Sequence, residues 1–123
     1  MNLINNVKIK RIYEPPTSDD GYRVLVDRIW PRGISKEKAH LDEWAKSISP
    51  SAEIRKAFHH DADLMEEFKG KYLQELDNNE FAHDFVTRIR NKLEDAPVTL
   101  LYAAKDPTHN NAVILKEWLD QRL

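Results

Sequence analysis

The chain has 123 residues and a formal net charge of −2, with 41% hydrophobic and 33% charged residues, which is typical of a soluble globular protein and excludes a disordered chain. This length predicts a single domain over residues 1–123. The lack of cysteine excludes disulfides and thiolate chemistry, and with no signal peptide or apolar stretch of about 18 residues we expect a cytoplasmic protein without a membrane span.

Two strands are predicted near the start of the chain. Residues 7–13 alternate apolar and basic side chains, the period of a half-buried strand. Residues 22–26 are more completely apolar, which favours an interior strand. The intervening EPPTSDDG at residues 14–21 is rich in turn formers and predicts a surface loop.

Three helices are predicted in the middle of the chain. The first begins with Ser49 as N-cap and Pro50 in the first turn and runs to about Phe58. The second covers about 63–77 and ends at Asn78-Asn79. Its apolar face consists of Leu64, Phe68, Tyr72 and Leu76, with Met65 and Leu73 beside them. The third has the same spacing at Phe81, Phe85, Ile89 and Leu93, and ends near Pro97.

The end of the chain predicts a strand followed by a helix. Residues 98–102 are a short apolar run, which favours a strand buried on both faces. The final helix, about residues 109–121, is expected to bury Val113, Leu115, Trp118 and Leu119. This order of elements predicts an α/β fold, in which a small, at least partly parallel sheet of about three strands is layered with about four helices.

Polar segments follow two of the predicted strands. DRIWPRG occupies residues 27–33 after the second strand, and AAKDPTHNN occupies residues 103–111 after the last. If these strands are parallel neighbours, both segments lie at the sheet edge where α/β proteins bind ligands. Asp27 is the candidate catalytic acid or base. The candidate ligand-binding residues are Arg28, Trp30, Arg32, Tyr102, Lys105, Asn110 and Asn111.

Anion binding is the chemistry that such a crevice favours. Arginine presents a planar fork of donors that matches phosphate or carboxylate, and a helix N-terminus adds free N–H groups. Trp30 could stack on a base or ring. We therefore expect a nucleotide or another phosphorylated small molecule. An architectural interpretation is equally open: Asp27 and Arg28 form an ion pair, Trp30 plugs the core, and Asp106 caps a helix.

The sequence contains no motif that predicts a metal site or a nucleotide cofactor site. Adjacent histidines point in different directions on a helix, so His59-His60-Asp61 with Asp63 does not predict a metal site. With three glycines, the chain has neither a P-loop nor a dinucleotide fingerprint, so the cofactor stays unknown. Arg55 and Lys56, with His60, either add positive charge to the crevice or form a solvated helix face.

Several motifs together resemble one family. They are GYRVLVDRIWPRG, LDEW, IRKAFHHD, the F-x-x-x-Y-x-x-E-L of residues 68–76, TLLYAAKD and NNAVILKEWL. In order and spacing these are similar to the domain of unknown function 488, in its YeaO-like branch, from about Lys8 to Leu119. The resemblance implies a small α/β protein of bacteria and archaea with no established activity. Broader members carry a Cys-His-Arg triplet in a segment similar to residues 105–111, where this chain has Asn110-Asn111 and no cysteine.

Alternatives to the anion-binding crevice remain. A nucleic-acid-binding module would use Trp30 as a stacking platform and the cations Lys8, Lys10, Arg11, Arg28 and Arg32, although a pI near 6.2 weighs against it. S-adenosylmethionine-dependent methyl transfer ranks lower, because the usual glycine-rich loop is missing. An edge strand at residues 7–13 could also pair two copies into a homodimer.

Overall fold

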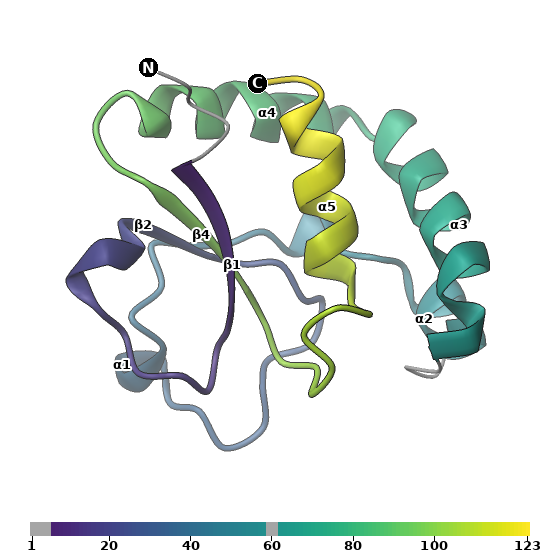
Figure 1. Cartoon of the computed structure of the whole chain (residues 1–123), viewed down its shortest axis with the longest axis horizontal. Coiled ribbons are helices and arrows are strands. Elements are labelled where there is room, and N and C mark those ends of the chain that lie inside the picture. Colours follow the sequence, from purple (N-terminus) through teal and green to yellow (C-terminus); the bar gives the residue numbers. More distant parts are fainter. Residues whose placement is uncertain (1–5, 59–61) are drawn as a thin grey trace.

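A four-stranded parallel sheet forms the centre of the protein. The computed structural model describes residues 6–58 and 62–123 (Figure 1). The strands are β1 (Val7–Arg11), β2 (Tyr22–Leu25), β3 (Glu43–Trp44) and β4 (Val98–Tyr102), in the spatial order β1-β4-β2-β3. Every neighbouring pair is parallel. The carboxyl ends of all four strands therefore meet at one edge of the sheet.

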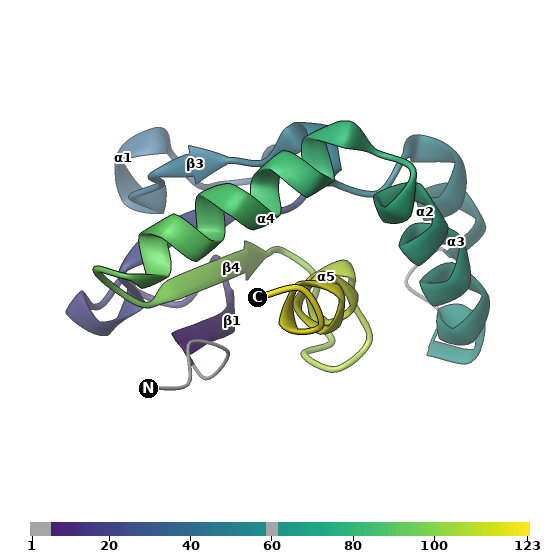
Figure 2. The ribbon, with the colours of Figure 1, turned by 90° about the horizontal axis from the view of Figure 1, so that it is seen from above.

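The long helices cover one side of this sheet. The helices are α1 (Lys36–Ala39), α2 (Ala52–Phe58), α3 (Met65–Asp77), α4 (Glu80–Leu93) and α5 (Asn111–Asp120). Helix α5 packs on β1 and β4, α4 also contacts β4, and α3 packs against both α4 and α5 (Figure 2). Helix α2 packs on α3 beyond the end of the sheet. Among the described helices, none has the length and apolar character of a membrane span.

The pleat of the strands divides the buried side chains between two cores. Val24, Leu100 and Tyr102 point into the larger core, which the four long helices enclose. Leu25 and Leu101, on the other face, pack in a smaller core under α1 and the loop that precedes it. Strand β4 is buried along its whole length because it lies between β1 and β2 and is covered on both faces.

The α/β fold and the parallel sheet confirm the sequence-based expectation, and several boundaries need correction. Strand β1 ends at Arg11, because the Arg11 carbonyl accepts the Glu14 N–H and begins a turn. Ser49 does not cap α2: its hydroxyl donates to the carbonyl oxygen of Ala45, and the helix begins at Ala52. Residues 62–64 form a 3₁₀ turn before α3. Strand β3 and helix α1 were not expected.

Two apolar side chains lie in a different environment from the expected one. Phe81, in the first turn of α4, is 63% exposed. The buried face of α4 begins instead at Ala82 and Phe85. In α5, Ile114 is fully buried and Val113 only half-buried. Helix α5 begins at Asn111 with Asn110 as its N-cap, two residues later than expected.

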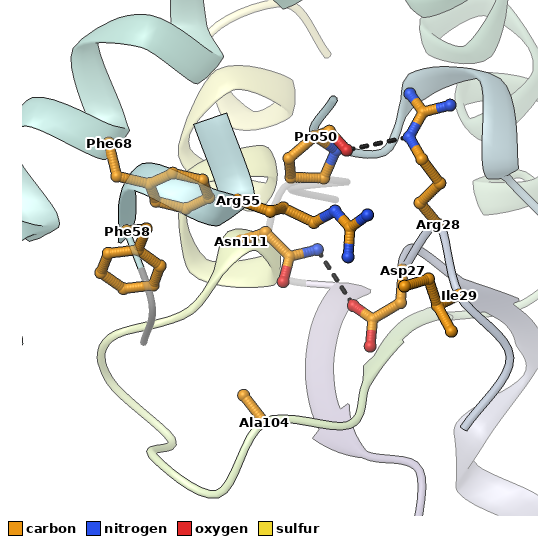
Figure 3. A pocket seen from close by; sticks show the side chains of 9 residues that line it. All are labelled: Asp27, Arg28, Ile29, Pro50, Arg55, Phe58, Phe68, Ala104 and Asn111. Carbon is orange, nitrogen blue, oxygen red and sulfur yellow. Dashed lines mark hydrogen bonds between the residues drawn. The ribbon is translucent and has the colours of Figure 1, made fainter. Parts of the chain in front are cut away.

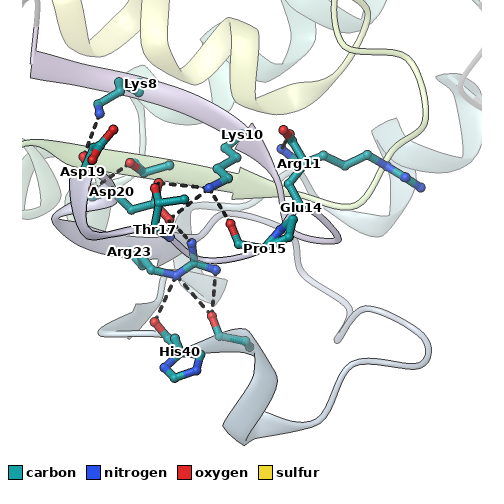
Figure 4. Close-up of polar contacts among 12 residues, drawn as sticks. Lys8, Lys10, Arg11, Glu14, Pro15, Thr17, Asp19, Asp20, Arg23 and His40 are labelled. Carbon is teal, nitrogen blue, oxygen red and sulfur yellow. Dashed lines mark hydrogen bonds and ion pairs between the residues drawn. The ribbon is translucent and has the colours of Figure 1, made fainter.

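A buried ion cluster supports the smaller core. Asp20, in the loop between β1 and β2, pairs with Arg23 on β2 and with Lys10 on β1 (Figure 4). Asp20 and Arg23 are each only 4% exposed. The Arg23 guanidinium also donates to the carbonyl oxygens of Ala39 and His40 at the end of α1. Lys10 and Arg23 therefore fix the loop and α1 onto one face of the sheet.

The charge of Asp20 makes the free energy of unfolding depend on pH in the acidic range. Burial alone raises the pKa of this carboxyl, but hydrogen bonds from Thr17, Lys10 and Arg23 outweigh burial and lower the pKa from 3.8 to about 2. Since the folded-state pKa is depressed, the stabilisation is complete above about pH 4 and is lost as the pH falls through about 2. We expect the stability advantage of wild type over Asp20→Asn to shrink by about 2 kcal/mol between about pH 5 and pH 2.

Urea unfolding at a series of pH values measures this difference. Other carboxyl groups titrate in both proteins, so their contributions cancel in the comparison. An advantage of wild type that stays constant over the whole range would mean that the charge of Asp20 contributes nothing.

Candidate ligand-binding site

The carboxyl ends of β2 and β4 bring the two predicted polar segments together. Leu25 pairs with Leu101, and the Val26 N–H donates to the Leu101 carbonyl at 3.0 Å. Asp27 follows directly, and its Oδ2 accepts the backbone N–H of Ala103 at 2.9 Å. The Asn111 amide donates to Asp27 Oδ1 at 3.1 Å and to the Val26 carbonyl at 2.8 Å. Asp27 thus joins the end of β2 to the loop after β4 and to the start of α5.

Arg28 holds the segment that leads into α2. Its Nε donates to the Pro50 carbonyl at 3.0 Å and its Nη2 donates to the Ser49 carbonyl at 2.9 Å. No ion pair joins Arg28 to Asp27 in the part of the chain that the structure describes. The expected Asp27–Arg28 ion pair is therefore wrong, because the guanidinium reaches away from Asp27 toward these carbonyls. One edge of Arg28 is structural, and Nη1 makes no such bond to a described residue.

A pocket of about 230 Å³ lies beside Asp27 and Arg28. Its polar lining comes from the segment after β2, from α2 and from α5, and its apolar lining comes from α2, α3 and the loops between the elements. The lining residues are Asp27, Arg28, Ile29, Pro50, Arg55, Phe58, Phe68, Ala104 and Asn111 (Figure 3). Phe58 and Phe68 stack on each other with ring centroids 4.4 Å apart, and they form an apolar wall. The pocket therefore combines polar groups with an apolar surface, as small-molecule sites do.

Arg55 lines the pocket, and its side chain makes no hydrogen bond or ion pair to another described residue. Its side chain extends from α2 into the pocket (Figure 3). The Nε atom is buried and has no hydrogen-bond partner among the described residues. No ion pair of Arg55 occurs among them either. A buried donor without a partner costs about 1–3 kcal/mol, so Arg55 is poised to gain a hydrogen-bond acceptor.

Trp30 and Arg32 do not reach this pocket. The indole N–H of Trp30 donates to the Ile34 carbonyl at 2.7 Å, and its ring packs edge-on against Trp44 over the smaller core. This contact agrees with the architectural interpretation of Trp30. Arg32 is exposed, and its carbonyl accepts the Tyr13 hydroxyl at 2.8 Å. The loop at residues 27–33 thus turns away from the pocket after its first three residues.

Three candidates from the second segment also lie elsewhere. Tyr102 is 4% exposed in the larger core, where burial raises the pKa of its hydroxyl. Lys105 lines a separate open groove with Arg11 and Tyr13. Asn110 caps α5, since its Oδ1 accepts the Val113 N–H at 3.1 Å and its amide donates to the Asp106 carbonyl. Of the predicted set, Asp27, Arg28 and Asn111 share the pocket.

Asp106 has the capping role of the architectural interpretation, although it caps the turn before α5. Its Oδ1 accepts the N–H groups of Thr108 and His109 at 2.9 and 3.1 Å, and Oδ2 pairs with the His109 ring. The Thr108 backbone N–H is the largest cause that lowers the pKa of Asp106 to about 2, while burial opposes the shift. This acid is fully engaged with its own turn.

Sequence reasoning missed Phe58 and Phe68 as site residues and did not decide between two interpretations of Arg55. The spacing of Arg55 and Phe58, three apart on one helix, places both on the same face of α2. That spacing was the available signal, but a sequence does not say which surface the face meets. Of the cations expected for a nucleic-acid surface, Lys10 pairs with Asp20 and Lys8 donates to the Asp19 carbonyl.

No group of His, Asp and Glu side chains among the described residues is arranged to hold a metal ion. The His59-His60-Asp61 run considered for metal binding lies outside the described residues. Within residues 6–58 and 62–123, the ionisable groups of the pocket are therefore Asp27, Arg28 and Arg55.

Comparison with known proteins identifies the family. The family model described as "Inactive DUF488-N3 subclade" matches residues 6–123. The chain belongs to the DUF488 family. This membership confirms the resemblance seen in the motifs, and the match covers the whole described fold, including the pocket.

Relatives within this family share nearly the full length of the chain. The uncharacterized protein YeaO of Escherichia coli is 47% identical over 114 residues, which cover 93% of this chain and 96% of YeaO. The uncharacterized protein Mb3100c of Mycobacterium bovis is 36% identical over 118 residues, with coverage of 94% and 95%. No solved structure matches the chain. The comparisons therefore establish the family and assign no activity.

Proposed function

We propose that the protein binds a small anionic molecule, a phosphorylated metabolite or the phosphate of a nucleotide, in the pocket beyond β2 and β4. The observation that carries this proposal is Arg55, whose buried Nε lines the pocket without a hydrogen-bond partner among the described residues. A phosphate or carboxylate would supply the acceptors that a guanidinium fork fits best. Arg28 also lines the pocket, and Phe58 and Phe68 offer an apolar wall to the rest of the ligand.

The size of the pocket limits the ligand. Its volume of about 230 Å³ is below the roughly 300–1,000 Å³ of pockets that enclose drug-sized molecules. A small phosphate monoester fits this volume better than a whole nucleotide, whose base would extend beyond the pocket. The size thus favours a phosphorylated metabolite within the predicted class.

The proposal concerns binding of the ligand and does not include a reaction of that ligand. The family model names its subclade inactive, and the chain has no cysteine that could act as a thiol nucleophile. Asp27 is the candidate acid or base for any reaction, since it lines the pocket. Its two oxygens also hold Ala103 and Asn111 in place, which supports a positioning role for this carboxylate.

The test replaces Arg55 and measures binding of ethyl phosphate and inorganic phosphate by calorimetry. We expect Arg55→Gln to weaken binding about tenfold to a hundredfold, because a charge-assisted hydrogen bond is lost. The matched control is Lys56→Gln, which removes the same charge from the next, exposed position of α2. Its affinity should stay within about twofold of wild type.

Stability separates this result from a folding defect. Because the Arg55 side chain makes no hydrogen bond or ion pair to another described residue, Arg55→Gln should not lower the free energy of unfolding by more than about 0.5 kcal/mol. Equal weakening by Arg55→Gln and Lys56→Gln, or no weakening by either, would refute the proposal. Arg28 is less suitable for this test because its removal would also release Ser49 and Pro50.

A further inference from the structure

A second cavity borders the loop that follows β4. This groove has a volume of about 490 Å³ and is lined by Arg11, Tyr13, Ala103, Ala104, Lys105 and Asp106. It belongs to the same edge of the sheet as the pocket, because Arg11 ends β1 and Ala103 follows β4. It therefore lies where parallel α/β sheets bind ligands. Ala104 lines both cavities, but the groove shares no charged residue with the pocket.

The Arg11 side chain is fixed at the groove by contacts with the backbone. Its Nε donates to the carbonyl oxygens of Ala103 and Ala104, at 3.3 and 3.1 Å. The side chain extends away from the buried cluster of Lys10 and Asp20 (Figure 4). Neither Nη atom hydrogen-bonds or pairs with another described residue. Arg11 thus presents two donor groups in a fixed position to an anion.

Lys105 adds a second cation to the groove. It is exposed, and within residues 6–58 and 62–123 it makes no hydrogen bond or ion pair. The neighbouring acids are engaged elsewhere: Asp106 holds the turn before α5, and Glu14 accepts the Arg11 backbone N–H. Both cations therefore keep donors for a ligand. Because the two acids lower the local positive charge, the groove favours a single phosphate over a run of phosphates.

Tyr13 supplies an aromatic surface beside these cations. Its hydroxyl donates to the Arg32 carbonyl at 2.8 Å, and the Arg11 guanidinium lies 4.6 Å from the centre of its ring. These two contacts hold the ring in place although Tyr13 is 39% exposed. An exposed ring is a surface on which a nucleobase stacks, and a ring that is already held loses little conformational entropy on binding.

We propose that this groove binds a single nucleotide, a nucleoside monophosphate whose phosphate contacts Arg11 and Lys105 and whose base stacks on Tyr13. The site goes beyond the proposed function, because it uses none of the charged residues of the pocket. A guanidinium and an ammonium group match a phosphate monoester, and the ring beside them matches its base. The groove, at about 490 Å³ against about 230 Å³, has room for the base that the pocket does not enclose.

The first test titrates adenosine monophosphate (AMP) into the Arg55→Gln protein by calorimetry, so that the pocket contributes little. Ribose 5-phosphate carries the same phosphate and sugar without a base, and we expect AMP to bind at least about fivefold tighter. No binding of AMP to this protein at millimolar concentration, or equal affinities for the two ligands, would overturn the inference.

The second test removes one cation in the same Arg55→Gln background. Lys105→Gln should weaken AMP binding about threefold to tenfold, because it removes a charged donor for the phosphate and no contact within the described fold. The matched control is Lys56→Gln, at an exposed position of α2, which should leave the affinity within about twofold. Equal effects of the two substitutions would count against the groove and refute the proposal.

The third test examines the ring of Tyr13. Tyr13→Phe keeps the ring and loses only the hydroxyl bond to Arg32, so its affinity for AMP should stay within about threefold. Tyr13→Leu should lower the affinity for AMP at least about fivefold and leave that for ribose 5-phosphate unchanged. If Tyr13→Phe and Tyr13→Leu bind AMP equally, the base does not stack on this ring and the proposal is wrong.

A fourth titration separates a single nucleotide from a nucleic-acid strand. An oligoadenylate of five nucleotides should bind at most about fivefold tighter than AMP, the statistical gain from five equivalent nucleotides, since the groove holds one phosphate. A larger gain would overturn the choice of a single nucleotide.

The two proposals fail in different ways. If wild type does not bind ethyl phosphate but AMP binding depends on Lys105 and Tyr13, the proposed function fails and this inference stands. If ethyl phosphate binds through Arg55 but Lys105→Gln does not change AMP binding, only this inference is refuted.

Discussion

Replacing Arg23 by methionine is expected to lower the free energy of unfolding by about 3–5 kcal/mol. Methionine fills a similar apolar volume, so the loss comes from the polar contacts. The change leaves the buried Asp20 carboxylate without its guanidinium partner, and it leaves the carbonyls of Ala39 and His40 without their donor. Urea unfolding followed by circular dichroism measures the loss as a shift of the midpoint.

The chain offers a matched control on its surface. Arg88 forms a two-bond ion pair with Glu43, at 3.0 and 2.6 Å, but its side chain is 43% exposed. Because water reaches the Arg88 side chain and screens this pair, and Glu43 keeps the Tyr22 hydroxyl as a hydrogen-bond donor, Arg88→Met should cost no more than about 1 kcal/mol. Similar losses in Arg23→Met and Arg88→Met would show that burial does not decide how much an ion pair contributes to this fold.

The long helices and the buried strand were predictable from the sequence, because many apolar side chains in each follow the period of one buried surface. Helix α3 was expected over 63–77 and lies at Met65–Asp77, and β4 has the predicted bounds. Helix α1 and strand β3 have four and two residues, which is too short for a hydrophobic period to develop. They exist because Arg23 holds the end of α1 and β2 pairs with β3, and a sequence does not show such contacts.

The site was partly predictable for a similar reason. Parallel pairing of β2 and β4 brings the segments after both strands to one edge of the sheet, so Asp27 and Asn111 were placed together correctly. A few residues further on, loop conformation decides direction: Arg32 turns to solvent and Lys105 to another groove. Arg55 reaches the pocket from a helix that packs beyond the sheet, and only the tertiary structure brings it there.

Gly21→Ala is expected to lower the free energy of unfolding by at least about 3 kcal/mol. Gly21 has φ of +63°, which L-residues adopt at a cost, and an added Cβ would lie 2.0 Å from the Pro97 carbonyl oxygen. That oxygen accepts the Tyr22 N–H, the bond that begins the pairing of β2 with β4. The clash is with backbone, so relief requires the two central strands to separate at their first residues.

Urea unfolding of alanine variants at all three glycines separates the cost of the positive φ from the cost of the clash with Pro97. Gly33 has φ of +80° but open space around its Cα, so Gly33→Ala should show the backbone cost alone, about 1–2 kcal/mol. Gly70 lies inside α3 with nothing nearby, so Gly70→Ala should stabilise the protein by about 0.5–1 kcal/mol. If Gly21→Ala costs no more than Gly33→Ala, the close approach of Pro97 does not constrain the sheet, and the register of β2 and β4 must depend on other contacts.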